Sequence, residues 1–226
     1  MNLEGILPVN KEKGRSAFYL VKVLRKLSQI KKIGHAGILD PFATGVMIML
    51  IGRPYTKIAS TFIHHEKEYI ATVRLGASTT TYDSEGPVTA TSTVIPTLEE
   101  IKEALKAFQG RVKQIPPMFS AKKVKGQKLY VLARKGIEIE REPIEVSLNV
   151  TLLDYAYPLL KLQIRSSKGA YMRTVAYDLG QKLGTEGHLI ELNRIASGPF
   201  VLKDCIDAKS LSDPSCNWMD YLRKEA

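Results

Sequence analysis

Cysteine and histidine are scarce in this chain of 226 residues, which contains two cysteines and four histidines. Cys205 and Cys216 are too few for a disulfide framework, and we interpret both as reduced thiols. Only His64 and His65 lie close together in the sequence, and they form no zinc-binding spacing with the cysteines. The sequence therefore predicts neither a disulfide scaffold nor a metal site.

Long apolar runs are also missing. No stretch reaches the roughly 18 consecutive apolar residues that a membrane-spanning helix needs. The first residues, MNLEGILPVNKEKG, lack the basic-then-apolar order of a secretory signal. The hydrophobic fraction of 44% and the charged fraction of 25% are those of an ordinary globular domain. We therefore expect a cytoplasmic protein with no membrane partner.

Positive charge is in excess, since 33 Lys and Arg against 23 Asp and Glu give a net charge of +10. Residues 111–141 hold nine basic and two acidic residues, so this basic segment alone carries +7. Prolines and aromatic residues alternate with the charges, as in a surface that binds folded RNA by shape and stacking. A solvated, flexible loop is the alternative. The candidate RNA-contacting residues are Lys122, Lys123, Lys125, Lys128 and Arg134.

A single acid, Asp40, stands in the fourteen-residue stretch GHAGILDPFATGVM, between a glycine-rich segment and Pro41. Glycine and proline shape the backbone, so Asp40 is expected on a non-helical loop. The following run, Val46 to Ile51, is typical of a buried strand. A carboxylate supported in this way can be a reactive group. Ordinary turn chemistry, in which the Asp side chain caps a backbone amide, is the alternative.

The regular elements alternate between helix and strand. Ser16 is a helix N-cap, and Leu20, Val23, Leu24 and Leu27 follow at the spacing of one helical face. Thr97 and Glu100 make the capping box of a second helix, which ends at Gly110. A short helix is expected at 55–63. Alternating residues predict strands at 68–75 and 160–165. A short strand is expected from Ile6 to Val9 before a basic turn, and the polar residues 79–86 predict a loop.

A further helix is predicted from Met172 to Leu183, with Gly184 as its end. Arg173 lies in its first turn, where a cation is unfavourable to the helix dipole. Its position therefore suggests that a carboxylate holds it. A surface salt bridge of little energetic consequence is the alternative.

Three stretches resemble the TruB family of tRNA pseudouridine synthases. The first contains His35, Asp40 and Pro41, followed by Ala43-Thr44-Gly45. The second runs from Ile115 to Gly136 and is similar to the family's Pro-Pro, Ser-Ala and Ala-Arg-x-Gly pattern. The third, from Ser167 to Gly180, includes Lys168-Gly169, Tyr171, Arg173 and Asp178-Leu179. Together these stretches extend the resemblance over roughly residues 4 to 200.

The resemblance implies an α+β fold of the pseudouridine synthase type. In that fold a mixed, mainly antiparallel sheet is flanked by helices, with the basic segment as an RNA-binding insertion. A last strand near 188–194 is implied by the same family resemblance. We expect a catalytic domain over 1–206 and a short C-terminal tail over 207–226. Family members often continue into a small RNA-binding domain of the PUA type, which about twenty residues cannot form, so we expect no PUA domain.

The resemblance also implies an isomerase that converts uridine-55 to pseudouridine in the T-loop of tRNA, with no cofactor. Asp40 is the expected nucleophile, and Arg173 pairs with it and keeps it ionised. Tyr69, which follows Lys67 in a Lys-x-Tyr pattern, stacks on the extruded base. His35 stabilises the flipped-out RNA. The other expected substrate-binding residues are Tyr171, Leu192, Lys57 and Lys11.

One position departs from the family pattern, because Asn193 stands where the usual sequence has the first arginine of Leu-Arg-Arg. One expected backbone or RNA contact is therefore in doubt. We expect the T-arm of tRNA as partner and a monomeric protein. Two other functions remain open: a non-catalytic tRNA folding chaperone and a guide-RNA-dependent synthase subunit. A nuclease would require paired carboxylates or a pair of histidines near Asp40, and the sequence shows neither.

Overall fold

The computed structural model describes residues 3–124 and 126–224. The chain forms two compact units, the first made of residues 1–70 and 192–226 and the second of residues 71–191. It passes from one unit to the other inside two strands, β4 (Lys67–Leu75) and β12 (Gly187–Ser197). Within the described residues, no helix combines the length and apolarity needed to cross a bilayer.

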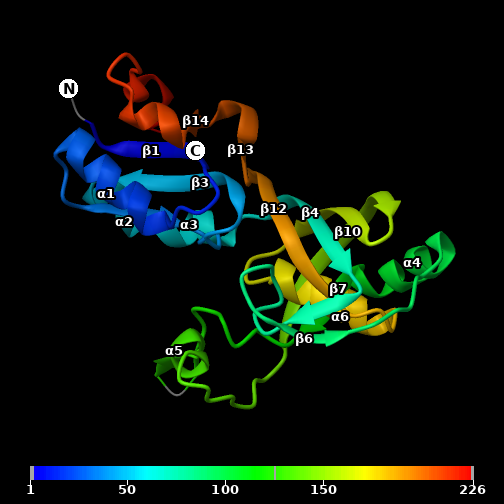
Figure 1. Ribbon diagram of the computed structural model, residues 1–226. Coiled ribbons are helices and arrows are strands. Elements are labelled where there is room, and N and C mark those ends of the chain that lie inside the picture. The colour runs from blue at the N-terminus through cyan, green and yellow to red at the C-terminus, as the bar shows by residue number, and fades with distance from the viewer. Residues whose placement is uncertain (1–2, 125, 225–226) are drawn as a thin grey trace. The chain divides into compact units, whose positions relative to one another are not determined.

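The first unit is built on strands that run in the order β14-β1-β3-β12, with β2 on β3 and β13 on β12 (Figure 1). Strands β1 and β3 are antiparallel, whereas β12 pairs with β3, and β14 with β1, in parallel. Its other elements are β1 (Gly5–Lys11), α1 (Ala17–Ser28), β2 (Ile33–Ala36), β3 (Thr44–Ile51), α2 (Arg53–Lys57), α3 (Ala59–His64), β13 (Phe200–Val201) and β14 (Ile206–Asp207).

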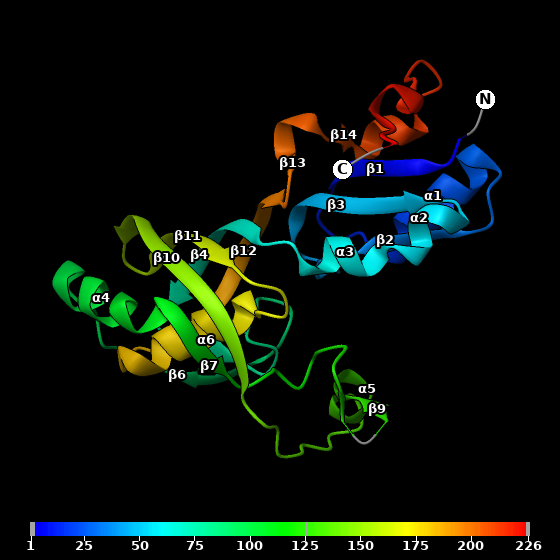
Figure 2. The ribbon, with the colours of Figure 1, turned by 180° about the vertical axis from the view of Figure 1, so that it is seen from behind.

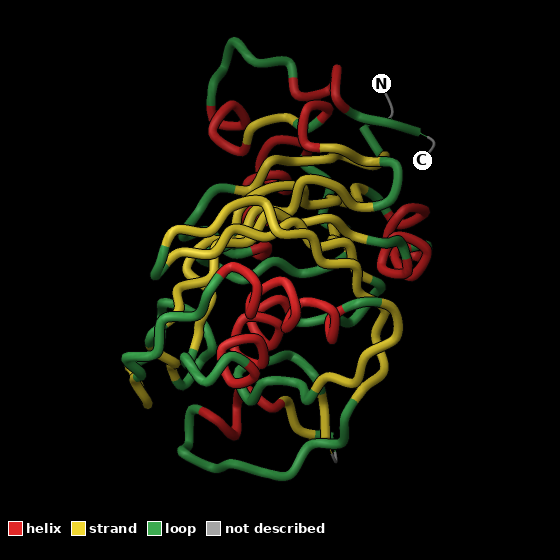
Figure 3. The backbone as a smooth tube through the Cα atoms, turned by 90° about the vertical axis from the view of Figure 1, so that its right-hand side faces the viewer, coloured by secondary structure: helices red, strands yellow, loops and turns green. Residues whose placement is uncertain are grey.

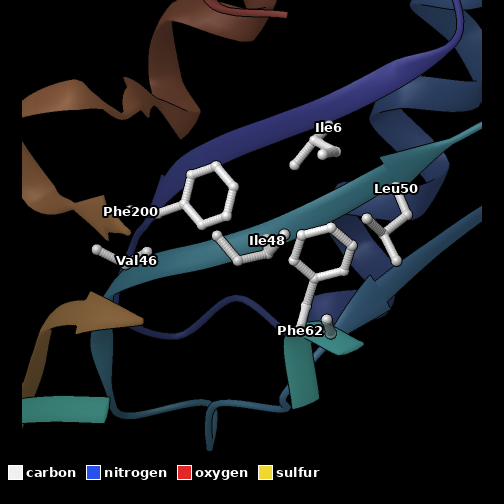
Figure 4. Close-up of a cluster of buried hydrophobic side chains, with 7 residues drawn as sticks. Ile6, Val46, Ile48, Leu50, Phe62 and Phe200 are labelled. Atoms are coloured by element: carbon white, nitrogen blue, oxygen red, sulfur yellow. The ribbon is translucent and has the colours of Figure 1, made fainter. Parts of the chain in front are cut away.

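Strand β3 is the centre of this unit, because its residues from Val46 to Ile51 are completely buried. One face of the strand contributes Val46, Ile48 and Leu50 to an apolar cluster (Figure 4). Ile6, Ala36, Phe62 and Phe200 complete the cluster from β1, β2, α3 and β13. The prediction that this run forms a buried strand directly after the Asp40 loop is confirmed.

Helix α1 begins as predicted, since the Ser16 hydroxyl accepts a hydrogen bond from the backbone N–H of Tyr19. The predicted buried face was partly wrong. Val21 is buried and Leu27 is exposed, so the packed face of the helix includes Val21 and excludes Leu27. The buried Ser28 hydroxyl donates to the carbonyl of Leu24, which allows a polar residue to end the packed stripe.

Strands in the order β4-β11-β10-β7 form the sheet of the second unit (Figure 2), and β10 is antiparallel to both β11 and β7. The capping box of Thr97 and Glu100 at the start of α4 is confirmed. The other elements are β5 (Ala77–Thr79), β6 (Val88–Thr91), α4 (Leu98–Leu105), β7 (Gly110–Gln114), β8 (Lys123–Val124), β9 (Gln127–Lys128), α5 (Leu129–Ala133), β10 (Ile144–Ala156), β11 (Leu159–Ser166) and α6 (Met172–Lys182).

The basic segment 111–141 begins in β7 and carries the small group β8, β9 and α5 at the end of two irregular stretches, 115–122 and 134–143. These stretches are drawn as long loops leading to and from α5 (Figures 1 and 2), and Figure 3 draws loops in green. Inside the segment, Leu129 is fully buried, and the backbone N–H of Tyr130 donates to Ser120. Backbone hydrogen bonds thus join the start of α5 to the irregular stretch that precedes it.

The α+β fold with a mixed, mainly antiparallel sheet and flanking helices is confirmed. The helix predicted at 55–63 is two short helices, because α2 ends at Lys57 and α3 starts at Ala59. The helix predicted to end at Gly110 also ends early, since α4 gives way to a 3₁₀ turn at Lys106–Phe108. The break between α2 and α3 places the candidate residue Lys57 at a helix end.

Candidate active site

Asp40 lies on the loop between β2 and β3, as the sequence predicts. The backbone N–H of Ala43 donates to the Asp40 carbonyl at 3.1 Å, which closes a tight turn over Pro41. Leu39 and Phe42 on either side are buried, while Asp40 itself is half-buried. The two apolar neighbours fix the loop to the core and leave the carboxylate near the surface of the first unit.

Lys11 stabilises this loop from the end of β1. Its side chain is completely buried, and its Nζ donates to the carbonyl of Pro41 at 3.1 Å. The same ammonium donates to the carbonyls of Arg15 and Glu12, at 2.7 and 2.8 Å. These three carbonyls accept from a buried ammonium, which has three N–H donors. They fit a role in holding the Asp40 loop, and the contact of Lys11 with substrate stays a prediction.

Arg194, in β12, holds the same loop from the opposite side and was not predicted. Its Nη2 donates to the carbonyl of Gly37 at 3.0 Å, and its Nε donates to the carbonyl of Val46 at 2.7 Å. These two carbonyls lie just before and just after the Asp40 turn, and the guanidinium is buried. A single planar fork therefore fixes both ends of the loop.

Gly45 makes the close pairing of β3 with β12 possible. Its φ is +103°, and a Cβ at this position would lie 2.2 Å from the backbone oxygen of Arg194. The Oδ1 of Asn193 would be 2.5 Å from the same Cβ. The Asn193 side chain thus fills the space beside Gly45, and its buried Oδ1 has no hydrogen-bond partner among the described residues. Only glycine fits here, because the obstruction is backbone.

His35, in β2, has a half-buried ring whose Nδ1 has no hydrogen-bond partner in the described part of the chain. Burial, followed by the positive charge of Arg194, lowers the pKa of His35. The imidazole is therefore neutral at pH 7, and its predicted role is contact with RNA rather than proton transfer.

The remaining candidates of the first unit lie on three elements. Tyr69 is buried on the inner face of β4, and Leu192 is buried in β12, where its carbonyl accepts from the Thr44 hydroxyl at 3.4 Å. Lys57 is exposed at the end of α2. The placement of Tyr69 on the apolar face of its strand agrees with the predicted alternation. The substrate contacts of all three stay predictions.

Arg173 is buried in the first turn of α6, in the second unit. Its Nη1 donates to the carbonyl of Thr81 at 2.9 Å and lies 3.4 Å from the Oδ2 of Asp83. Its Nη2 donates to the carbonyl of Phe119 at 2.8 Å. A carboxylate does hold this cation, as its position in the helix suggests, and within the second unit that carboxylate is Asp83.

Asp83 is itself well fixed. Its Oδ1 accepts from the Thr81 hydroxyl at 2.6 Å and from the backbone N–H of Glu85 at 3.0 Å. The loop around it is tied to β12, because Leu189 donates to the Tyr82 carbonyl and Ser84 donates to the Leu189 carbonyl. The predicted loop at 79–86 is therefore an ordered support for Arg173, and the buried charge of Asp83 is balanced by hydrogen bonds as well as by the guanidinium.

Gln114, at the end of β7, determines the backbone position of Tyr171. Its side-chain oxygen accepts from the Tyr171 N–H at 3.0 Å, and its side-chain nitrogen donates to the Tyr171 carbonyl at 3.2 Å. Gln114 is buried, so the start of α6 is joined to the sheet by a pair of hydrogen bonds that mimics a strand pairing. The side chain of Tyr171 is half-buried beside it.

The predicted RNA-contacting residues lie in the basic segment, where Lys123, Lys128 and Arg134 are exposed and Lys122 is half-buried. The charges of Lys128 and Arg134 lie 5.6 and 5.4 Å from the centre of the Tyr130 ring. This aromatic ring between two cations agrees with the interleaving seen in the sequence. Lys125 lies outside the described residues.

The predicted pair of Asp40 with Arg173 joins residues of different units, and it stays a prediction. Arg194, Asp83 and Gln114 were not predicted. Arg194 and Gln114 act on backbone groups far away in the sequence, and a backbone acceptor leaves no sequence pattern. The acid-and-threonine composition of the 79–86 loop was the one available signal for Asp83.

Solved structures with a similar fold include one described as "Crystal Structure of a Cbf5-Nop10-Gar1 Complex", with a TM-score of 0.74 and 20% sequence identity. This similarity covers 97% of the present chain and 60% of the other chain. A second, "Structure of H/ACA RNP bound to a substrate RNA containing 2'-deoxyuridine", has a TM-score of 0.69 at 18% identity, over 98% and 59% of the two chains. These two likenesses establish the fold.

The sequence comparisons are closer. Residues 25–172 match the family described as "TruB family pseudouridylate synthase (N terminal domain)", and residues 173–226 match "tRNA pseudouridylate synthase B C-terminal domain". A protein of Protochlamydia amoebophila named "tRNA pseudouridine synthase B" is 55% identical over 93% of this chain and 80% of its own length. One of Chlamydia abortus with the same name is 50% identical over 97% and 94%. The chain therefore belongs to the TruB family of pseudouridylate synthases.

Proposed function

We propose that the protein isomerises a uridine of tRNA to pseudouridine, and that the target is uridine-55 in the T-loop. The observation that carries this proposal is the match to relatives named "tRNA pseudouridine synthase B" over nearly the whole chain. Their names favour this function over a non-catalytic chaperone and over a guide-RNA-dependent subunit.

Asp40 is the proposed nucleophile. The reaction breaks the bond from the ribose to N1 of uracil, turns the base and joins it again through C5, from which a proton is released. A covalent enzyme intermediate splits this exchange into two easier steps. Whichever atom Asp40 attacks, its carboxylate has to be held in place while the base turns. The bonds from Lys11 and Arg194 to the loop backbone supply that support.

Arg173 is proposed to pair with Asp40 in the active enzyme and to stabilise its negative charge. Its bonds to Thr81, Asp83 and Phe119 leave the guanidinium little conformational freedom. Tyr69 is proposed to stack on the extruded uracil, with Tyr171 and Leu192 lining its pocket. His35, neutral at pH 7, contacts the flipped-out RNA, and Lys57 contributes a surface charge to the same substrate.

The proposed partner is the T-arm of tRNA, bound by a monomer in the cytoplasm, where tRNA is modified. The basic segment supports this partner, because exposed lysines and an aromatic ring between two cations match a phosphate backbone with unpaired bases. The departure at Asn193 fits a local structural role, since its side chain packs beside Gly45.

Release of tritium from a tRNA transcript labelled at C5 of uridine tests the proposal, because C5 loses its hydrogen only when it becomes the glycosidic carbon. The wild-type protein is expected to release one tritium per target uridine. Asp40→Asn is expected to release none while still binding tRNA. Asp154→Asn removes an exposed carboxylate of the second unit and serves as the matched control. Tritium release by Asp40→Asn at the wild-type rate, or tRNA binding without any release by the wild-type protein, would contradict the proposal.

A further inference from the structure

A second basic segment lies in the first unit, between Lys13 and Lys32. These twenty residues include seven Lys and Arg and no Asp or Glu, so the segment carries +7. The basic segment 111–141 also carries +7, which leaves −4 on the rest of a chain whose net charge is +10. The positive charge of the protein is therefore concentrated in two segments, and the proposed function uses only one of them.

Helix α1 gives this second segment a definite surface. Its buried stripe is Ala17, Leu20, Val21, Leu24 and Ser28, which packs into the first unit. The opposite stripe is basic and aromatic, and we call it the α1 face. The α1 face consists of Arg15, which directly precedes the N-cap, and of Phe18, Tyr19, Lys22, Arg25 and Lys26, and these residues follow each other at spacings of one or three residues.

The aromatic residues of the α1 face lie beside its cations. Phe18 is 57% exposed, which is unusual for a phenylalanine, and the Nζ of Lys22 lies 5.3 Å from its ring centre. The guanidinium carbon of Arg15 lies 4.6 Å from the centre of the Tyr19 ring. Two cation-aromatic pairs thus stand next to each other on one exposed helix surface.

Folding alone accounts for little of this pattern. The helix dipole favours Arg25 and Lys26 in the last turn, but it disfavours Arg15 beside the N-cap. Across residues 3–124 and 126–224, no carboxylate lies within salt-bridge distance of any cation of the α1 face. Helix α4 shows the ordinary arrangement, since Lys102 and Lys106 pair with Glu99 and Glu103 one turn away. A solvated face of the usual kind mixes both signs.

We infer that the α1 face is a second RNA-binding surface, which contacts the phosphate backbone of the tRNA with its cations and an unpaired base or a ribose with Phe18. The inference rests on the proposed function. Concentrated Lys and Arg with an exposed aromatic ring are the groups that bind single-stranded or looped nucleic acid. A membrane would require the apolar stripe of the helix, and that stripe is packed in the core.

The test measures how tRNA binding depends on salt in two variants, a triple variant of the α1 face and a double variant that serves as the control. Lys22→Gln/Arg25→Gln/Lys26→Gln removes three charges with residues that favour helix, so α1 is expected to remain folded. Lys102→Gln/Lys106→Gln removes two exposed lysines, one from α4 and one from the 3₁₀ turn that follows it, and is the control. Dissociation constants are measured on a tRNA transcript between 50 and 200 mM KCl, with circular dichroism to verify folding.

The α1 variant is expected to bind at least about tenfold more weakly at 100 mM KCl, and its slope of log affinity against log salt is expected to fall by roughly two to three. The control is expected to change neither quantity by a comparable amount. Phe18→Ala is expected to weaken binding without changing the slope, because a stacking contact releases no counterions.

An unchanged affinity and slope in the α1 variant would overturn the inference, and so would an equal loss in the control. The inference would also be overturned if the α1 variant lost binding to anionic phospholipid vesicles but bound tRNA as the wild type does, because the face would then bind lipid. Tritium release separates this inference from the proposed function. If the wild-type protein releases tritium and the α1 variant binds tRNA as the wild type does, only the inferred binding surface is refuted. If tRNA binding depends on the α1 face but the wild-type protein releases no tritium, only the proposed reaction is refuted.

Discussion

Replacement of Asp83 by Asn tests whether Arg173 depends on a partner other than the nucleophile. The side chains of Asp83 and Arg173 are only 4% and 7% exposed, and they approach to 3.4 Å. Removal of one member of a buried ion pair costs about 3 to 5 kcal/mol. We expect about 3 kcal/mol, the low end, because Arg173 keeps its bonds to the carbonyls of Thr81 and Phe119.

For a chain of this size, that loss corresponds to a melting temperature lower by about 6 to 12 °C. Asn keeps the shape of Asp and can still accept from Thr81 and Glu85, so the loop itself should persist. The released guanidinium should slow tritium release at saturating tRNA more than it weakens tRNA binding. Asp204→Asn is the control, because its ion pair with Arg223 lies on the surface and should contribute less than about 1 kcal/mol.

A double-mutant cycle with Arg173→Met isolates the contact. If the two side chains interact as described, the double variant should be more stable than the sum of the single effects predicts, by more than about 1 kcal/mol. Additive effects, or an Asp83→Asn protein as stable as the wild type, would refute the reasoning and leave Arg173 without the support described here.

Three further predictions concern the supports of the site. Arg194→Lys should lower the free energy of unfolding by about 1 to 3 kcal/mol and should reduce kcat, because one ammonium cannot replace a fork that reaches both Gly37 and Val46; an unaltered melting temperature and kcat would contradict this. Gly45→Ala should destabilise the protein by more than about 2 kcal/mol, whereas Gly110→Ala, which also has positive φ but meets nothing within 4 Å, should cost about 1 kcal/mol in the same denaturant titration. Burial raises the pKa of Asp178 to about 6, so the folded state favours the protonated carboxyl, and wild-type stability should fall as pH rises from about 4 to above 6. Asp178→Asn should lose this dependence and gain up to about 3 kcal/mol over the wild type at pH 7, and less if solvent screens the partly buried group; parallel stability curves for the two proteins would show that Asp178 is not the titrating group.

Local chemistry is what the sequence predicts well. The N-cap at Ser16, the capping box of Thr97 and Glu100, and the buried strand after Asp40 each depend on residues within one turn or one strand of each other. The family patterns add positions that no local rule gives, such as Arg173. Elements and their ends are therefore readable wherever neighbours in sequence determine them.

The buried face of α1 could not be predicted from the sequence. Leu20 and Leu24 belong to two overlapping stripes, one that continues through Val23 and Leu27 and one that continues through Val21 and Ser28. Hydrophobicity favours the first, yet the helix packs with the second, in which the buried Ser28 hydroxyl donates to the Leu24 carbonyl. The choice between the stripes is made by the elements against which the helix packs.

Long-range hydrogen bonds to the backbone are the other limit. Arg194 lies 148 and 157 residues from the carbonyls of Val46 and Gly37 that it binds, and Lys11 lies 30 residues from the carbonyl of Pro41. Every residue has a carbonyl, so no residue type marks the acceptor. Asp83 was harder to assign for a different reason: the family pattern supplies another carboxylate for Arg173, and a loop rich in Thr and Asp offers several ways to use an acid.

The choice of acceptors around the Asp40 loop has a consequence for the response of the protein to acid. A guanidinium keeps its proton throughout the range in which proteins fold, and a peptide carbonyl gains none there. The bonds from Arg194 to Gly37 and Val46 therefore do not depend on a group that gains or loses a proton as the pH falls. The turn that carries Asp40 should therefore keep its backbone conformation on acidification for as long as the protein stays folded.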